Sequence, residues 1–480
     1  MVESLDSRYR GKCLSIQFTI ILFRCREHPG IIGNWSFSPI RQYMAQDSPD
    51  AKSRTEDVVK VGDDALQSLE QPLHKTLKDS QGNTDSELEA IALKGPPVYQ
   101  HILALVFTVK EINRNPELLP NITLGFHIVN NYFPAKITYK ATLSLLSTQQ
   151  KFVPNFTCDL KKTFIAAIGG RLTENSFIMA TVLANYKIPQ LAYGTFSSVH
   201  GDKNVFPFLY QMVPNEMHQY TGIIQLLKHF GWNWIGILAV DDDYGDMFLQ
   251  KIEPLLSQNG ICYAFILKTP QKAYVDEYIH LIAMELRYDQ LFMDDKVKVC
   301  LIYALPPSME NLRIMIFVAS WTSLPSLGKV WIITAHWNFE SLSIQKLWDI
   351  QSFHGALSFA VRSKEPPGFQ EFLHTVRPSW VKEDNFIQNF WEQAFDCPLH
   401  KSSINENNNL LCTGDENLEN LPSILFEMRM GGQSYNIYNA VFVMVHSLHA
   451  LLKSRSRCRN AIGTEQLIFQ NLKPWQESSA

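Results

Sequence analysis

The architecture depends on a segment that begins with Phe164-Ile-Ala-Ala-Ile-Gly-Gly170 and runs to Tyr244. Its first five residues form a short apolar run that predicts a strand. The glycine pair predicts a tight turn, and Phe177–Tyr186 predicts a helix. A helix that begins just after a strand presents backbone N–H groups and the positive end of its dipole. An anion such as a carboxylate fits there, and Thr173 adds a hydroxyl near that point.

The same pattern then repeats along the segment. We expect a strand over Ile188–Tyr193, a helix over His218–Phe230, a strand over Trp234–Val240 and a helix over Met247–Ser257. Strands that alternate with helices indicate a parallel sheet with right-handed crossovers. In such sheets the loops at the carboxyl ends of the strands build the ligand site. Three side chains lie at or near these turns: Thr173, Glu216 and Tyr244.

Composition narrows the classes of function. The 480 residues are enough for two or three domains, and the net charge of −4 gives no electrostatic reason to expect nucleic acid as a partner. The sequence contains no G-x-S-x-G, H-E-x-x-H, Walker-type or G-x-G-x-x-G pattern, so hydrolase, metalloprotease, nucleotide-hydrolysing and dinucleotide-binding functions lack their signatures. We therefore expect no enzyme, and no catalytic residues, cofactor or metal.

The cysteines and the glycosylation triplets help to decide whether the chain folds in an oxidising, secretory compartment. Eight cysteines form no C-x-x-C pair, and Cys397 and Cys412 bracket a polar loop. A bridge between them would close a surface loop and suit an oxidising compartment, and two unpaired thiols are the alternative. Triplets of the form N-x-S/T occur at Asn34, Asn121 and Asn155. These matter only if the chain enters the secretory pathway.

The N-terminal residues 1–94 are expected to hold little folded structure. Basic residues precede an apolar run over residues 13–23, which resembles the core of a signal peptide, although no small-residue cleavage site follows. Residues 41–94 are polar with little apolar periodicity, which is typical of a disordered segment. Ordered structure is expected from Gly95 on. No stretch has the ~18 uninterrupted apolar residues of a transmembrane helix.

Each motif also has an explanation that needs no ligand. Gly169-Gly170 followed by Thr173 suits a plain turn at a helix start. Asp241-Asp-Asp243 could hold a cation, but such residues more often cap the following helix and sit in water. Glu216 by itself is typical of a solvated acid at a helix start.

Several longer runs resemble one receptor family. Among them are Tyr210-Gln-Met-Val-Pro-Asn-Glu216, His229-Phe-Gly-Trp-Asn-Trp-Ile-Gly236 and Val240-Asp-Asp-Asp-Tyr-Gly245, with others at residues 103–123, 188–194, 390–397, 412–416 and 435–440. In this order they resemble the vomeronasal type-2 receptors, from Gly95 to Gln476. The resemblance implies the extracellular ligand-binding region of a class C G-protein-coupled receptor, which is a plasma-membrane protein.

The resemblance also implies an α/β fold of the bilobed Venus-flytrap type, similar to the type I periplasmic binding proteins. Each of its two lobes would be a parallel sheet with helices on both faces. Lobe one would comprise residues 95–213 and 350–465, lobe two residues 214–349, and residues 466–480 would return toward lobe two. A ligand in the cleft would favour the closed form. Closure would then rearrange a homo- or heterodimer formed through lobe one.

The site residues follow from the same resemblance. In amino-acid-binding members a hydroxyl residue after the glycine turn holds the ligand carboxylate, an acid after a Val-Pro segment holds the amino group, and a tyrosine before glycine covers that group. Thr173, Glu216 and Tyr244 match these positions. Gly194 and Phe196 follow the second strand at the same site, and Phe196 stands where a hydroxyl residue is common.

Two departures leave the ligand and the form of the protein open. The acid that glutamate-binding relatives carry before a lobe-two tryptophan is absent, since Thr334-Ala335-His336-Trp337 stands there, so an amino acid and a peptide remain alternatives. The chain also stops where the family continues into a cysteine-rich domain and seven membrane helices. We expect part of a pheromone or other chemosensory receptor, which reaches its G protein only through that membrane domain. The alternative is a truncated decoy or heteromer partner, and this chain alone would be secreted or retained.

Overall fold

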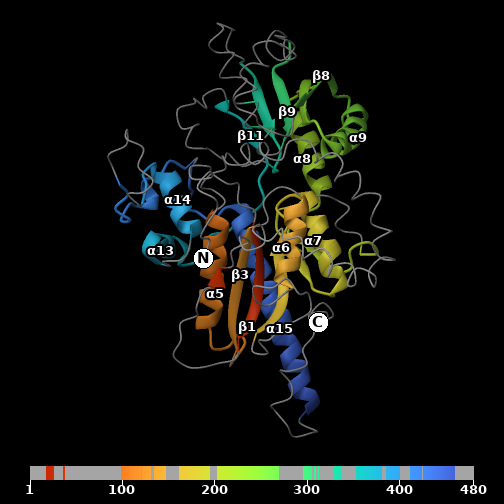
Figure 1. Ribbon diagram of the computed structural model, residues 1–480. Coiled ribbons are helices and arrows are strands. Elements are labelled where there is room, and N and C mark those ends of the chain that lie inside the picture. Colours follow the sequence, from red (N-terminus) through yellow and green to blue (C-terminus); the bar gives the residue numbers. More distant parts are fainter. Residues whose placement is uncertain are drawn as a thin grey trace, which may run out of the picture.

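The computed structural model (Figure 1) describes most of the chain from Tyr99 on and two short N-terminal strands. The described residues are 18–25, 36–37, 99–120, 122–130, 135–146, 162–194, 203–269, 296–304, 308–309, 312, 328–336, 353–380, 385–399, 411–423 and 425–459. Several expectations lie outside them: Phe196, the triplets at Asn34, Asn121 and Asn155, and residues 41–94 and 466–480.

Six strands form sheet A, the centre of lobe one. In spatial order they are β2 (Ser36–Phe37), β3 (Thr123–Asn130), β1 (Phe18–Cys25), β4 (Lys162–Gly169), β5 (Gln190–Ala192) and β6 (Leu209–Gln211). The last three run parallel, as their alternation with helices predicts. Gly169 pairs with Ala192, and Ala192 with Gln211, so these strands end level with one another at one edge of the sheet.

Strand β1 departs from the expected pattern. It runs antiparallel to both neighbours, with Phe18 opposite Asn130 and Ile20 opposite Ile168. The sequence analysis expected a signal-like run over residues 13–23, whereas residues 18–25 form a central strand, so sheet A is mixed rather than wholly parallel. A short apolar run rich in β-branched residues suits a central strand as well as it suits the core of a signal peptide.

Helices cover both faces of sheet A. They are α5 (Tyr99–Arg114), α6 (Ala135–Leu145), α7 (Thr173–Asn185), α13 (Phe369–His374), α14 (Asn385–Phe395) and α15 (Gly432–Arg459), with short 3₁₀ turns at Pro378–Trp380 and Leu418–Asn420. Ala166 and Ile168 of β4 share a core with α5, α13, α14 and α15, whereas Ala167 packs with α7. This alternation is what a strand buried on both faces requires.

Five parallel strands form sheet B, the centre of lobe two, which Figure 1 shows above lobe one. In spatial order they are β11 (Leu357–Ser358), β10 (Val330–Ile333), β9 (Val299–Tyr303), β7 (Trp234–Val240) and β8 (Cys262–Thr269). Ile237 and Ala239 face α8 (Glu216–His229) and α9 (Asp243–Gln258), and Leu238 faces a separate core on the other side. Both sheets are therefore sandwiched layers, as the α/β prediction requires.

The chain returns from lobe two to lobe one later than the sequence analysis placed it. Residues 350–465 were assigned to lobe one, but β11 is the edge strand of sheet B and Phe353 packs with Trp331 in the core of lobe two. Contacts with lobe one begin beyond it, where Glu365 accepts a hydrogen bond of 3.0 Å from the backbone N–H of Met430. A two-residue strand is too short to leave a periodic signal in the sequence.

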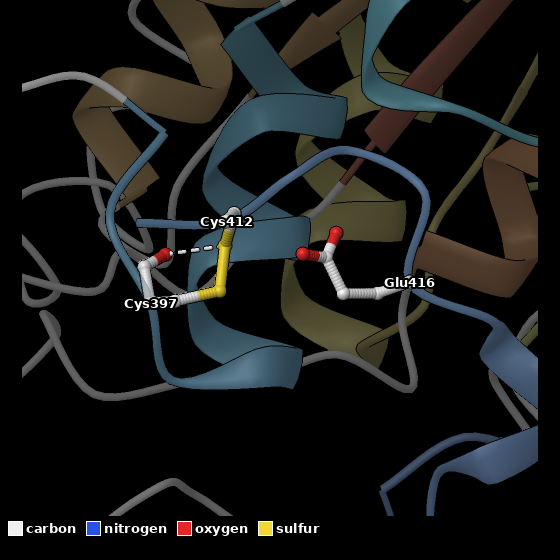
Figure 2. Close-up of side chains that lie close together, drawn as sticks. All are labelled: Cys397, Cys412 and Glu416. Carbon is white, nitrogen blue, oxygen red and sulfur yellow. Dashed lines mark hydrogen bonds between the residues drawn. A yellow bond between two sulfur atoms is a disulfide. The ribbon is translucent and has the colours of Figure 1, made fainter. Parts of the chain in front are cut away.

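A disulfide joins Cys397 and Cys412 at one end of lobe one (Figure 2). Beside it Glu416 accepts hydrogen bonds from the indole Nε1 of Trp391 at 2.6 Å, the backbone N–H of Thr413 at 2.6 Å and that of Gly414 at 2.9 Å. Both sulfur atoms are used in the disulfide, so this group of residues offers no thiolate to a metal ion. It is an anchor that ties the loop after Cys412 to α14.

We expect the Glu416 anchor to weaken in acid. Burial alone would raise the pKa of Glu416, but hydrogen bonds from Trp391 and Thr413 hold it at about 2, below the ordinary value of 4.5. A depressed folded-state pKa stabilises the fold above pH 4.5, and that contribution is lost as the pH falls from 4.5 toward 2. Urea unfolding of the wild type and Glu416→Gln between pH 7 and pH 2 measures it. The two stabilities should converge in acid.

Candidate functional site

The start of α7 follows directly on β4 through a turn that only glycine can make. Gly170 has a φ of +84°, and a Cβ there would lie 2.5 Å from the hydroxyl of Ser176. Leu172 is the N-cap residue of α7, and it offers no side-chain hydrogen bond to the helix. Thr173 is the first helical residue and is partly exposed. The positive end of this helix is thus not neutralised by a capping side chain, and a hydroxyl stands beside it.

Gly194 belongs to the neighbouring turn after β5. A Cβ at this position would lie 2.9 Å from both the Cα and the carbonyl oxygen of Arg171. The turns after β4 and β5 therefore touch through backbone atoms, and any side chain at Gly194 would push them apart. Gly194, which the sequence analysis assigned to the ligand site, therefore lies at the carboxyl edge of sheet A. There it keeps the start of α7 close to β5.

Glu216 is the first residue of α8 and is only 5% exposed. The side chain of Asn215 caps this helix by accepting a hydrogen bond from the N–H of Met217. Glu216 Oε1 accepts a hydrogen bond of 3.0 Å from the hydroxyl of Tyr303 and lies 3.4 Å from Nε2 of His336. Burial raises the pKa of Glu216, and hydrogen bonds from Tyr220 and Tyr303 partly offset that rise. By sequence alone Glu216 is typical of a solvated acid, but in the structure its side chain is buried.

Lobe-two strands supply polar residues around Glu216 that the sequence analysis did not assign to the site. Tyr303 ends β9 and stacks on Phe248 of α9, with ring centroids 4.2 Å apart. Burial lowers the pKa of His336 to about 3, so this side chain is neutral at physiological pH. Gln219 of α8 accepts a hydrogen bond of 2.7 Å from the N–H of Ala335, which fixes the loop after β10 against α8. The sequence signal that could have found Tyr303 is its place at the carboxyl end of the apolar run Val299-Cys-Leu-Ile-Tyr303.

Tyr244 lies in the first turn of α9, which begins four residues before the predicted helix. Asp242 is the N-cap residue and accepts a hydrogen bond of 2.8 Å from the N–H of Gly245. Asp241 lies 3.8 Å from the amine of Lys268, which also contacts Asp246. Helix capping therefore explains Asp242 and ion pairing explains Asp241, while Asp243 is an acidic residue in the first turn of α9, where the helix dipole favours it.

Electrostatics connect the α7 start of lobe one with the α9 start of lobe two. Burial raises the pKa of Tyr244, and the charges of Glu174, Asp242 and Asp243 raise it further. Burial, followed by the charge of Asp242, also raises the pKa of Glu174, the residue after Thr173. Such effects act only at short range. Glu174, at the α7 start of lobe one, and Tyr244, at the α9 start of lobe two, are thus close enough for the charge of Glu174 to act on Tyr244.

Comparisons with known proteins agree with this architecture. A family model described as "Receptor family ligand binding region" matches residues 102–479. Vomeronasal type-2 receptor 26 of Mus musculus is 31% identical over 380 residues, which cover 79% of this chain and 43% of that protein. The extracellular calcium-sensing receptor of Homo sapiens is 29% identical over 380 residues, covering 73% and 34%. Taste receptor type 1 member 1 of Mus musculus is 29% identical over 383 residues, covering 78% and 42%.

The chain spans less than half the length of these relatives. Among the helices that the structure describes, none combines the length and the apolar character needed to cross a bilayer. The matched family is one of ligand-binding regions rather than of enzymes. The chain belongs to the family of receptor ligand-binding regions, and within it is similar to the extracellular regions of class C G-protein-coupled receptors.

Proposed function

We propose that the space between the lobes binds an α-amino acid or a short peptide by its charged backbone groups. The carboxylate would lie at the start of α7 and accept hydrogen bonds from backbone N–H groups and from Thr173. The ammonium group would lie against Glu216, with Tyr244 covering it. This assignment makes the chain the ligand-binding part of a chemosensory receptor.

One contrast between helix starts carries the proposal. Asn215 and Asp242 cap α8 and α9 with their own side chains, whereas Leu172 cannot cap α7. An uncapped 13-residue helix at the carboxyl edge of a parallel sheet is a suitable anion site. A buried acid, Glu216, begins α8 in lobe two. A zwitterion matches this pair of opposite charges.

Binding to both lobes would couple the ligand to lobe closure. A ligand that contacts α7 and α8 together has more contacts when the lobes are close, so it shifts the population toward the closed form. Glu174 and Asp242 carry like charges that oppose closure, and the ligand ammonium would offset them.

In a complete receptor, closure would be transmitted through a dimer formed by lobe one to a G protein at the membrane domain. Sedimentation velocity tests the dimer, and a monomer at micromolar concentrations would argue against it.

Replacing Glu216 by glutamine should weaken ligand binding by about 2 kcal/mol, or roughly thirtyfold in Kd. The variant keeps the size of the side chain and an oxygen for Tyr303, but it loses the charge that faces the ammonium group. Titration calorimetry of the full chain with a panel of L-amino acids and short peptides measures the change. Glu371→Gln, at an exposed position of α13, is the control and should bind as the wild type does. Unchanged affinity in Glu216→Gln would contradict the assignment.

A further inference from the structure

The chain passes from lobe two back to lobe one over Phe359, Ala360 and Val361. On the lobe-two side, the backbone N–H of Phe359 donates a hydrogen bond of 2.9 Å to the carbonyl oxygen of Ile333, the last residue of β10. The ring of Phe359 lies against α8, since a Cβ at Gly222 would be 2.8 Å from one of its ring carbons. Phe359 therefore packs with the core of lobe two.

Val361, two residues later, packs on lobe one. A Cβ at Gly432, the first residue of α15, would lie 2.6 Å from the carbonyl oxygen of Val361 and 2.8 Å from its Cβ. Only glycine leaves room for so close an approach of two backbones. Further along the same segment, Glu365 accepts the hydrogen bond from Met430 that is described above. The chain from Val361 on is thus held on lobe one.

The lobe-one surface at the start of α15 is itself tightly held by Gln100 of α5, whose side chain is buried. Its Nε2 donates hydrogen bonds to the carbonyl oxygens of Glu427 at 2.6 Å and Arg429 at 2.8 Å. Its Oε1 accepts hydrogen bonds from the N–H of Gly431 at 3.0 Å and the hydroxyl of Ser434 at 2.7 Å. The amide has no further donor or acceptor to offer. A movement of the lobes cannot be absorbed at this surface without breaking these bonds.

Ala360 makes none of these contacts. It is exposed, and its backbone N–H and carbonyl oxygen form no hydrogen bond with a residue in the described part of the chain. Because its side chain is a single methyl group in solvent, its φ and ψ can change without moving a packed group. Within this crossover, the dihedral angles of Ala360 are therefore not fixed by contact with either lobe.

The crossover from lobe one into lobe two, between β6 and α8, has less freedom. Met212 is still tied to lobe one, because its N–H donates a hydrogen bond of 2.8 Å to the last residue of β5. Asn215 already caps α8 of lobe two. Between them, Val213 is only 6% exposed, and the ring of Pro214 fixes its own φ. A rotation between the lobes is therefore accommodated more easily at Ala360 than here.

We propose that Ala360 is the pivot of the movement between the two lobes, with Phe359 and Val361 as the fixed points on either side. The pivot rests on the proposed function, because lobe closure is part of that function. Hinge residues absorb changes in φ and ψ while the residues beside them stay packed. A substitution at Ala360 then changes the range of lobe positions without touching the ligand.

Distance measurements by double electron–electron resonance on the full chain without ligand test the pivot. Spin labels on p-acetylphenylalanine at the exposed positions 250 of α9 and 371 of α13 report the separation of the lobes and leave the cysteines unlabelled. Ala360→Gly should broaden the distribution of this distance, because glycine reaches backbone conformations that alanine does not. Arg362→Gly is the matched control, since Arg362 is exposed in the same segment but lies beyond the contact of Val361 with α15. Its distribution should match that of the wild type.

Two results of the distance measurement would overturn the pivot. Equal broadening in both variants would mean that the bend is spread along the segment. No broadening in either variant would mean that the lobes do not turn about this crossover.

A second arm uses calorimetry of the same variants with a panel of L-amino acids. Ala360→Gly should weaken binding about threefold, because glycine loses more backbone freedom than alanine when the closed form is fixed. Arg362→Gly should bind as the wild type does. If the wild type binds no amino acid, the proposed ligand is wrong, and broadening confined to Ala360→Gly still establishes the pivot.

Discussion

Replacing Trp391 by alanine is expected to lower the free energy of unfolding by about 4 kcal/mol. Trp391 is fully buried on α14, and its ring lies 4.9 Å from that of Phe395. The loss has two sources. The indole volume leaves a cavity in the core that α14 shares with α5 and α15, and Glu416 loses the hydrogen bond from the indole Nε1. The remaining partners of Glu416 are then backbone groups of its own loop, and the disulfide is the covalent link from that loop to the end of α14.

Urea unfolding followed by far-UV circular dichroism measures this loss without relying on tryptophan fluorescence. Trp391→Phe separates the two sources, because it refills most of the volume but cannot donate to Glu416. It should fall between the wild type and Trp391→Ala. Trp234, which is 45% exposed at the start of β7, is the matched control, and its replacement by alanine should cost less than about 1 kcal/mol. A similar small loss for Trp391→Ala would show that the anchor does not stabilise lobe one.

The sequence predicted most of those helices and strands whose local residue pattern agrees with their tertiary surroundings. Strand β7 spans Trp234–Val240 as expected, and α7 and α8 differ from their predicted ranges mainly at the ends. The observed helix ends differ from the predicted ones because capping residues determine where a helix begins. Asp242 caps α9, so this helix begins before the apolar periodicity does. Tyr244 was consequently expected in a loop but lies in a helix. Short strands such as β6 and β11 carry too few residues for a periodic signal.

Long-range partners account for most of what the sequence could not reveal about the site. Glu216 was recognised as an acid at a helix start, but its burial depends on Tyr303, which lies 87 positions further along the chain. Nothing in the local pattern around Glu216 distinguishes a buried acid from a solvated one. The sequence analysis missed strand β1 for a related reason. An apolar run shows that it will be buried but does not show between which neighbours.

Replacing Gly245 by alanine should destabilise lobe two by about 3 kcal/mol and weaken ligand binding as well. A Cβ at this position would lie 1.9 Å from the carbonyl oxygen of Val240, the last residue of β7. The obstacle is backbone rather than a flexible side chain, so relief requires the start of α9 to move away from β7. That movement would break the hydrogen bond by which Asp242 caps Gly245 and would displace Tyr244, the residue before it.

The two effects of Gly245→Ala can be measured separately. Urea unfolding reports the loss of stability, and calorimetry with the best ligand of the wild type reports the displacement of Tyr244. Gln250→Ala, at an exposed position of α9, is the control and should change neither, because no contact forms or breaks there. If Gly245→Ala unfolds at the wild-type urea concentration, the close packing of α9 on β7 is wrong. If it is destabilised but binds the ligand normally, Tyr244 does not cover the ligand, and Glu216 must hold the ammonium group without it.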